Sequence, residues 1–385
     1  MRKLAIITTH PIQYYAPVFR LLQQRGKISI KVFYTWGEAA ISKYDPGFGK
    51  DISWDIPLTE DYPFTWVRNV AANPGSHYKR GIINPTLISE IKQFNPSAIL
   101  VFGWAYQSHF EVMRYFHGKI PVYFRGDSTL LDEMPAWKKT IRYIWLKWVY
   151  HFINNAFYVG TNNRSYFKLY GLKDEQLAFA PHAIDNERFA ADCGKEARQL
   201  REQLNLRKKN ILILFAGKLE DKKSPLLLLE AFLDLQQDDV HLLITGNGQL
   251  EATLKASAAE SPNIHFLNFQ NQQYMPVIYQ AADLFCLPSQ GPGETWGLAV
   301  NEAMAAGAAI VVSDKVGCAT DLVTEKNGAI FTSGDLASLT KALKTLTADK
   351  QNLKQMGKHS KVVIAAWNFT NIAEAFENKL LNEKI

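Results

Sequence analysis

Glu294 and Glu302 stand eight positions apart, where the sequence predicts a strand, a loop and then a helix. The strand is the apolar run Leu284–Leu287, and the helix-forming stretch begins at Trp296 and ends at Gly307. A rise of about 1.5 Å per residue places Glu302 more than one turn inside the helix, whereas Glu294 lies in the entry loop. Two carboxylates placed in this way can hold different parts of one elongated ligand.

The start of this helix has the chemistry of an anion site. The N–H groups near Trp296, Gly297 and Leu298 lack partners within the helix, and the helix dipole adds about half a positive charge there. We therefore expect a phosphate group to bind at this end.

A second group of charges follows the predicted strand Ile211–Ala216, in the turn Gly217–Pro225. This turn contains Lys218 and Lys223 and precedes a Leu-rich helix. Such cations suit a diphosphate, although a solvated surface turn is the alternative for any one of them.

The Glu-x7-Glu spacing, followed by Ala303-Met-Ala-Ala-Gly307, resembles the motif of retaining glycosyltransferases of family 4, the glycosyl transferases group 1, which have the GT-B fold. The resemblance implies that Glu294 contacts the donor sugar and Glu302 the ribose hydroxyls. It also implies that Lys218 and Lys223 neutralise the donor diphosphate as it leaves.

The turn departs from the family pattern at two positions. Lys218 stands where the family has an arginine, so a bidentate phosphate contact is lost, and Ser224 replaces a glycine.

Two further stretches of the second half resemble donor-binding segments of the family. Gly246-Asn247-Gly248 is similar to the turn beside the donor. The stretch whose backbone meets the nucleobase in the family is resembled by Phe266–Phe269, then Met275–Tyr279 and Ala281–Asp283. Two glycines alone are a weak dinucleotide signal, and backbone contacts do not identify the base.

The first half offers candidates for the acceptor side. His10 lies in the loop after the first predicted strand, where many family members carry a Gly-Gly pair, and is either a polar contact in the cleft or a cap of a Pro-containing turn. Arg125 and Asp127 end another strand, where relatives often have a histidine near the reacting sugar. Asp127 could orient or deprotonate the acceptor hydroxyl, or it could be a turn aspartate. The aromatic residues of the segment Tyr44–Trp54 and of Trp104–Tyr106 are sugar-stacking platforms or loop anchors.

The stretch Pro135–Tyr150 predicts an amphipathic helix with two alternatives for its apolar face. That face could rest on a membrane, or it could cover a parallel sheet. Packing is favoured because a strand follows at Ala156. The predicted face consists of Ile141, Ile144, Trp145, Trp148 and Val149, with Lys138, Lys139 and Arg142 elsewhere on the helix.

Short apolar runs alternate with helical patterns along the chain, which predicts an α/β fold with parallel sheets. With the resemblance, this gives a GT-B fold in which two Rossmann-like domains face each other across a cleft, with the ligand bound between them. We expect an N-terminal acceptor-side domain over 1–190, a C-terminal nucleotide-sugar-binding domain over 191–366, and a terminal helix over 367–385 that packs back on the first domain. The predicted strands are 4–9, 29–35, 98–103, 122–125, 156–160, 211–216, 241–245, 264–267, 284–287 and 309–313.

Composition limits the class of protein. A chain of 385 residues with 47% hydrophobic residues can bury two large cores, and a net charge of +6 is too diffuse for a nucleic-acid binder. Three cysteines without metal-type spacing suggest a reducing cytoplasm, and neither a signal-peptide core nor a run of about 18 apolar residues is present. The metal-chelating pattern Asp-x-Asp is absent, so we expect lysines and the helix start to do a metal's electrostatic work, with no cofactor besides the donor substrate.

The sequence thus predicts a retaining, metal-independent glycosyltransferase that moves a sugar from a nucleoside-diphosphate sugar to a glycan, a lipid-linked or another hydroxyl acceptor. The setting suggested by the resemblance is bacterial polysaccharide, glycolipid or glycoconjugate biosynthesis, in the cytoplasm or peripherally on the inner face of the membrane. Two alternatives are a sugar-nucleotide epimerase on the same fold and a catalytically silent sugar-nucleotide-binding subunit.

Overall fold

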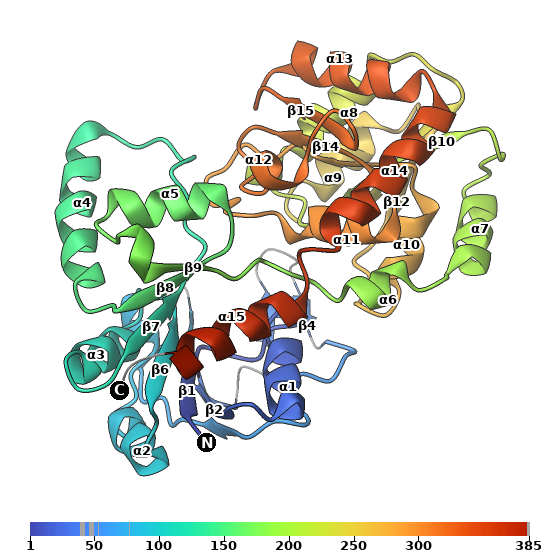
Figure 1. Cartoon of the computed structure of the whole chain (residues 1–385). Coiled ribbons are helices and arrows are strands. Elements are labelled where there is room, and N and C mark those ends of the chain that lie inside the picture. The colour runs from blue at the N-terminus through green and yellow to red at the C-terminus, as the bar shows by residue number, and fades with distance from the viewer. Residues whose placement is uncertain (39–42, 46–49, 53, 77, 383–385) are drawn as a thin grey trace. The chain divides into compact units, whose positions relative to one another are not determined.

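A computed structural model describes residues 1–38, 43–45, 50–52, 54–76 and 78–382. The chain forms two compact units (Figure 1). The first unit comprises Met1–Lys43, Pro57–His182 and Phe369–Ile385, and the second comprises Tyr44–Ile56 and Ala183–Asn368. The boundary thus lies at residues 182/183, and part of the predicted first domain, Tyr44–Ile56, groups with the second unit.

The first unit is built on a parallel seven-stranded sheet in the order β5-β2-β1-β6-β7-β8-β9. Continuous apolar runs form its central strands because helices cover both faces of such a sheet. The register sets Leu4 of β1 between Ile30 of β2 and Ala98 of β6. The strands are β1 (Lys3–Thr8), β2 (Ser29–Tyr34), β5 (Phe64–Trp66), β6 (Ala98–Phe102), β7 (Val122–Arg125), β8 (Asn155–Tyr158) and β9 (Leu177–Phe179), and the helices are α1 (Ala16–Arg25), α2 (Leu87–Phe94), α3 (Gln107–Phe116), α4 (Ala136–Tyr150), α5 (Thr161–Leu169) and α15 (Phe369–Asn382).

The second unit is built on a parallel six-stranded sheet in the order β12-β11-β10-β13-β14-β15, and β3 (Lys43–Asp45) pairs with β4 (Lys50–Ile52) in a separate ribbon. Its strands are β10 (Ile211–Ala216), β11 (Val240–Thr245), β12 (Ile264–Leu267), β13 (Leu284–Leu287), β14 (Ala309–Ser313) and β15 (Gly328–Phe331). Its helices are α6 (Asn186–Ala190), α7 (Gly194–Gln203), α8 (Pro225–Leu233), α9 (Glu251–Ser257), α10 (Met275–Ala281), α11 (Leu298–Ala306), α12 (Ala319–Leu322), α13 (Leu336–Thr347) and α14 (Lys350–Ile364).

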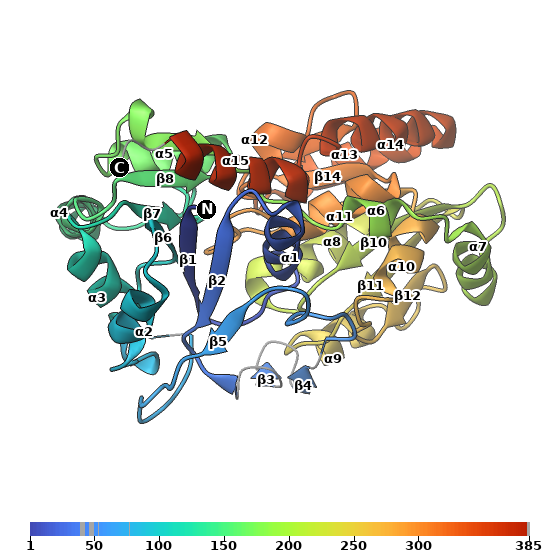
Figure 2. The same cartoon turned by 60° about the horizontal axis from the view of Figure 1, so that its bottom comes forward.

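The last helix, α15, belongs to the first unit and packs against α1, the first helix of the chain (Figures 1 and 2). The buried carboxylate of Glu377 accepts two hydrogen bonds from Nε of Arg25 at 2.9 and 3.0 Å. Glu374 adds a contact of 3.1 Å to Nη2 of the same arginine. Phe376 packs at 4.6 Å between ring centroids on Phe157 of β8. The first and the last helix of the chain therefore pack together in this unit.

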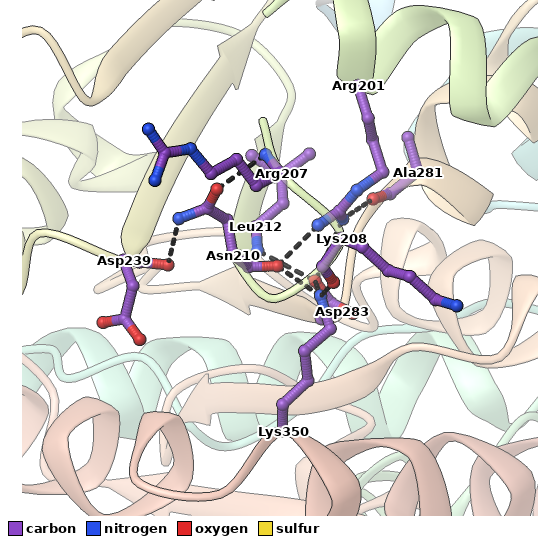
Figure 3. A network of polar contacts seen from close by, with 9 residues as sticks. All are labelled: Arg201, Arg207, Lys208, Asn210, Leu212, Asp239, Ala281, Asp283 and Lys350. Carbon is purple, nitrogen blue, oxygen red and sulfur yellow. Dashed lines mark hydrogen bonds and ion pairs between the residues drawn. The ribbon is translucent and has the colours of Figure 1, made fainter. Parts of the chain in front are cut away.

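Asp283 ties together the amino ends of β10 and β13 (Figure 3). Its Oδ2 accepts hydrogen bonds from Nη1 of Arg201 at 3.0 Å, from the Leu212 N–H at 2.9 Å and from Nζ of Lys350 at 3.2 Å. Asp283, which the sequence analysis grouped with the nucleobase stretch, therefore lies at the amino ends of these strands, whereas ligands of open parallel sheets bind at the opposite, carboxyl ends.

All ten predicted strands are present, and five match in both bounds: 122–125, 211–216, 264–267, 284–287 and 309–313. The three-residue strands β3, β4, β5 and β9 were not predicted, since so few residues carry little periodic signal, and β15 was not predicted either. The helix expected from Trp296 begins two residues later, at Leu298, because Gly297 takes a left-handed conformation with φ of 94°. It ends as predicted, with left-handed Gly307 donating its N–H to the Ala303 and Met304 carbonyls.

The packing predicted for the 135–150 helix is wrong for most of its apolar face. Helix α4 is held by Leu146, Val149 and Tyr150, which are buried. Four of the five residues expected in the core are instead exposed: Ile141, Ile144, Trp145 and Trp148. Among the described residues, no helix combines the length and the hydropathy that crossing a bilayer requires.

Candidate functional site

Lys223 and Glu294 meet at the carboxyl end of the second sheet. The Lys223 ammonium forms an ion pair with Oε2 of Glu294, and the Ser289 hydroxyl donates to the same oxygen at 2.8 Å. The Glu294 side chain is 9% exposed and that of Lys223 is 21% exposed, so the pair is largely shielded from water. The structure therefore brings together two residues that lie 71 positions apart and that the sequence analysis placed in one site.

The turn after β10 is fixed to the loop after β13 by its backbone. The Gln290 N–H donates to the Lys222 carbonyl at 2.9 Å, and the Gln290 amide donates to the Asp221 carbonyl at 3.2 Å. Ser224, which replaces the family's glycine, has the positive φ of 50° that a glycine would take without strain. The departure thus changes the residue and keeps the turn. Lys218 is half-buried and follows β10 directly, at the same edge of the sheet.

The loop that carries Glu294 is clamped by the segment after β14. The Gly317 N–H donates to the Glu294 carbonyl at 3.1 Å, and the Cys318 N–H donates to the Trp296 carbonyl at 2.9 Å. A Cβ at Gly317 would lie 1.7 Å from the Thr295 carbonyl oxygen, so only glycine allows this approach. The clamp holds the Glu294 backbone at the entrance to α11.

Trp296 and Gly297 shape the start of α11. The Trp296 side chain is 3% exposed, and its indole N–H donates to Oδ1 of Asn301 at 2.9 Å. No side chain caps the helix at Gly297, and a Cβ built there would lie 3.7 Å from Oε1 of Glu294. The uncapped turn at Leu298 and the Glu294 carboxylate are therefore neighbours. Trp296 itself stabilises this turn from inside.

Glu302 lies one helical turn deeper, as the spacing predicts. It is 4% exposed, and its Oε2 accepts a hydrogen bond from the Tyr279 hydroxyl at 2.9 Å. Tyr279 therefore orients this carboxylate, a role that the sequence analysis did not assign.

Gly246, Asn247 and Gly248 follow β11 and lie against the backbone that follows β10. A Cβ at Gly246 would be 1.9 Å from the Gly217 carbonyl oxygen, and one at Gly248 would be 2.5 Å from that of Leu219. Oδ1 of Asn247 accepts the Phe269 N–H at 2.7 Å, which joins this turn to the predicted nucleobase stretch. The two glycines thus serve close packing of three strand ends.

The aromatic segment 44–54 lies largely outside the described residues and side chains. Trp54 is described, and its ring lies 6.5 Å from that of Phe269. Next to it, Asp55 accepts the Gln273 N–H at 3.2 and 3.3 Å. At Tyr106 the hydroxyl donates to the Ser76 carbonyl at 2.9 Å, which favours the loop-anchor alternative for that residue.

In the first unit, Arg125 is a buried structural residue of the candidate site. The residue is 1% exposed, and its guanidinium donates to the carbonyls of Ala180 and Pro181 at 2.8 and 2.9 Å. It also lies 5.7 Å from the ring centre of Tyr15. Burial raises the pKa of Tyr15 to about 12, with Arg125 opposing the shift. The side chain predicted to contact a ligand instead holds the chain segment that follows β9.

His182 is the residue that the sequence analysis missed. Its Nε2 lies 3.6 Å from Oδ2 of Asp127, and its ring stacks on Tyr15 at 6.2 Å between centroids. The histidine is buried, whereas the Asp127 side chain is 46% exposed. Burial lowers the pKa of His182, and the hydrogen bond to Asp127 opposes this. A neutral imidazole thus orients a carboxylate that solvent can reach.

His10, in the loop after β1, contacts its neighbours. Its Nδ1 lies 2.8 Å from the Thr9 hydroxyl, and its ring makes an edge contact with Trp36 at 5.3 Å. These contacts support the turn alternative and leave its predicted ligand role untested.

A search of the described residues for metal sites finds no group of three or more His, Cys, Asp or Glu side chains that could hold an ion. Metal independence stays a prediction for experiment.

Comparison with known proteins assigns the second unit. Residues 196–363 match the family model described as glycosyl transferases group 1. This part of the chain is therefore similar to the glycosyl transferases group 1. The match includes the Lys223–Glu294 pair and Glu302, and it ends before α15 begins.

Similarity to individual proteins covers somewhat more than half of this chain. The lipopolysaccharide 1,2-N-acetylglucosaminetransferase of Salmonella typhimurium is 28% identical over 226 residues, which are 54% of this chain and 58% of that protein. The D-inositol 3-phosphate glycosyltransferase of Nocardia farcinica is 27% identical over 223 residues, 55% of this chain and 48% of that protein. A GDP-mannose-dependent phosphatidylinositol monomannoside mannosyltransferase of Corynebacterium glutamicum is 27% identical over 236 residues, 57% and 62% of the two chains. The matches thus span only about half to three fifths of these relatives.

Solved structures cover the whole chain and establish the GT-B fold. Sucrose-phosphate synthase from Thermosynechococcus elongatus gives a TM-score of 0.73 at 17% identity and covers 98% of both chains. The Anabaena protein HepE in complex with UDP gives 0.74 at 15% identity and covers 100% of both chains.

Proposed function

We propose that this chain is a retaining glycosyltransferase that transfers a sugar from a nucleoside-diphosphate sugar to a hydroxyl acceptor. The observation that carries the proposal is the shielded Lys223–Glu294 ion pair beside the uncapped start of α11. A cation and a helix start suit the diphosphate, and a carboxylate suits sugar hydroxyls. The group 1 family match and the HepE complexes with UDP and UDP-glucose support the same donor class.

Each donor-site residue then has a distinct task. Lys223 and Lys218 neutralise the charge that develops on the departing diphosphate, together with the N–H groups at Leu298. Glu294 accepts hydrogen bonds from the donor sugar. Glu302, oriented by Tyr279, accepts those of the ribose.

Binding of the donor exchanges partners at the ion pair. Without a ligand, the Lys223 ammonium is held by the Glu294 carboxylate. A diphosphate offers Lys223 a doubly charged partner, and the sugar hydroxyls satisfy Glu294 in turn. The pair is thus preorganised at a position where both groups are needed.

The turn Gly246–Gly248 and the backbone at Phe269, which Asn247 joins, would lie beside the nucleoside, as the family resemblance implies. The retaining course follows from the family resemblance: the leaving phosphate assists deprotonation of the acceptor on the same face. In this proposal a metal is not required, because lysines and a helix start supply the positive charge.

The acceptor belongs to the first unit in this proposal, at Asp127 with His182 behind it. Asp127 is exposed enough to accept a hydrogen bond from an incoming hydroxyl, and His182 fixes its orientation. The named relatives act on lipopolysaccharide and on phosphatidylinositol mannosides, which supports a glycolipid or polysaccharide acceptor at the cytoplasmic side of a membrane.

The test starts with donors. Nucleoside diphosphates and their sugar conjugates are screened for a rise in melting temperature, because a ligand of the folded state stabilises it by mass action. A rise with one base family supports the donor site, whereas no rise at millimolar concentration contradicts it. Lys223→Ala should abolish the rise. Lys222→Ala is the matched control, because its side chain is 43% exposed and forms an ion pair with nearby Glu220.

The reaction itself is tested with the donor so found. An NMR spectrum of the product shows whether the anomeric configuration is retained. Turnover should survive EDTA, and its loss with recovery on adding a divalent ion would contradict metal independence. Conversion of donor without an acceptor would point to an epimerase instead.

A further inference from the structure

Helix α4 presents an apolar face that the protein core does not use. Three residues on its inner side are buried and hold the helix to the first unit. Five large side chains at helical spacing point the other way and are 62%, 60%, 65%, 37% and 42% exposed. These five residues, which we call the α4 apolar face, are Trp137, Ile141, Ile144, Trp145 and Trp148.

The spacing of the face is regular along the whole helix. The intervals of four, three, one and three residues keep all five side chains on one stripe of a 15-residue helix. Scattered apolar residues on a surface need no explanation, but three tryptophans and two isoleucines on one stripe form a contiguous patch. Tryptophan is also the side chain that settles best between water and lipid, because its ring is large and apolar and its N–H is polar.

The charges around the face all have one sign on α4 itself. The helix contains Lys138, Lys139, Arg142 and Lys147, and it contains no Asp or Glu. The three lysines are exposed and the arginine is half-buried. A helix with apolar rings on one stripe and only cations beside it has the pattern of a helix that lies in a membrane interface.

A hollow of about 480 Å³ adjoins the face where α4 lies beside α3. Trp145 and Trp148 form one wall, and both rings contact Phe110 of α3, at 6.0 and 5.2 Å between centroids. Three cations and one acid complete it: Lys79, Arg80, Arg114 and Glu111, whose carboxylate accepts a hydrogen bond from Gln107. Lys79 also lies 5.7 Å above the Trp145 ring. The hollow therefore offers net positive charge directly beside two tryptophans.

We propose that the α4 apolar face docks the protein on an anionic lipid bilayer. The isoleucines and tryptophans enter the acyl boundary, and phosphate headgroups bind the lysines of α4 and the cations of the hollow. A second copy of this chain is the poorer occupant, because it would bring the same four positive charges of α4 against them. Anionic lipid satisfies the charges and the apolar surface together.

Docking on a bilayer would bring the first unit to a membrane-bound acceptor, and this benefit rests on the proposed function. Lipid binding itself does not depend on that function. Its test needs neither donor nor acceptor. A failure to bind lipid would therefore leave the donor-site proposal standing, and a failure to bind nucleotide would leave the docking surface standing.

The experiment is flotation of the full chain with vesicles of phosphatidylcholine containing phosphatidylglycerol and with vesicles of phosphatidylcholine alone. We expect binding to the first and much weaker binding to the second, with the difference falling as salt is raised. Ile141→Ser with Ile144→Ser should lower the partition coefficient by roughly tenfold or more, since each loses apolar area that would be buried in lipid. Val362→Ser on α14, at 70% exposure, is the matched control and should bind as the unmodified chain does.

Lys138→Glu with Lys139→Glu tests the charges separately and protects against a folding artefact, because both side chains are exposed. This variant should lose binding to anionic vesicles while keeping its melting temperature. The control, Lys358→Glu on α14, should keep both its binding and its melting temperature. Absence of binding by the unmodified chain overturns the proposal. So does a double isoleucine variant that keeps full lipid binding but changes from dimer to monomer in light scattering, because the face then belongs to a second copy.

Discussion

Gly246→Ala isolates the close packing on which the donor-side turn depends. Gly246 follows β11, and Gly217 follows the neighbouring strand β10 in the same register. A Cβ at Gly246 would lie 1.9 Å from the Gly217 carbonyl oxygen, whereas an ordinary contact begins at 3.4 Å. The backbone before Lys218 must therefore move by about 1.5 Å, the difference between these two distances.

Two costs follow from this movement. The φ of +133° at Gly246 is one that an alanine rarely adopts, which costs about 1 kcal/mol or more, and the overlap adds about 1–3 kcal/mol to the loss of stability. Misplacing a catalytic group by about 1 Å can cost roughly 100-fold in rate. We therefore expect a loss of about 2–4 kcal/mol in the free energy of unfolding and a loss of roughly 100-fold in kcat/KM, carried by the displaced Lys218.

The matched control is Gly118→Ala. Gly118 also has a positive φ, +75°, but nothing lies within 4 Å of a Cβ built there. Chemical denaturation of both variants, with transfer rates for the donor found in the nucleotide screen, separates conformational strain from steric overlap. If Gly246→Ala loses no more stability than Gly118→Ala and keeps its rate, the argument that only glycine allows this strand-end packing is refuted.

Three further predictions concern other parts of the molecule. Glu294→Gln should lower kcat more than it lowers nucleotide affinity, because the carboxylate contacts the sugar in the proposed site; equal losses in kinetics and in calorimetric affinity would contradict that role. Buried His109 has a pKa lowered to about 4 from 6.5 by desolvation. The stability that its neutral form contributes is therefore complete above pH 6.5 and is lost as the pH falls towards 4, by about 3 kcal/mol in denaturant titrations; a His109→Gln variant with the same pH slope would refute this. Glu377→Ala should cost about 2–4 kcal/mol of unfolding free energy, since it leaves Arg25 without its buried partner. Glu374→Ala, at 47% side-chain exposure, should cost under about 1 kcal/mol. Similar melting curves for the two variants would show that the buried Arg25–Glu377 pair does not hold α15 on α1.

The sequence predicted those parts of the fold that depend on long apolar runs. Strands such as Ile211–Ala216 and Ala309–Ser313 have bounds set by turn residues on both sides, and their positions follow from pattern alone. Glu294, Lys223 and Glu302 could be assigned to one site because their motifs, which follow such strands, resemble those of a glycosyltransferase family. Their contacts with Ser289 and Tyr279 could not, since these partners lie in other segments of the chain.

The errors arose where a local pattern has two tertiary outcomes. The apolar stripe of α4 fits a core or a membrane, and the strand that follows favoured the core. Only the packed structure shows that Leu146, Val149 and Tyr150 hold the helix while the stripe faces outward. Arg125 was expected near the reacting sugar, where relatives often have a histidine, but its guanidinium donates to the carbonyls of Ala180 and Pro181. His182 follows the three-residue strand β9, which is too short for a periodic signal, so nothing in the pattern brought it next to Asp127.

The pairing of α15 with α1 affects how the chain folds during its synthesis on the ribosome. The chain leaves the first unit at residue 182 and returns to it only at Phe369. At a synthesis rate of about 5–20 residues per second, the intervening segment takes about 10–40 s to emerge. During that time the strands of the first unit have been made without their last helix, and Arg25 of α1 has no Glu377 to pair with. The second unit, which needs nothing beyond residue 368, can be complete while the amino-terminal unit is still open. In a nascent chain the second unit can therefore be complete before the first unit, although synthesis of the first unit begins earlier.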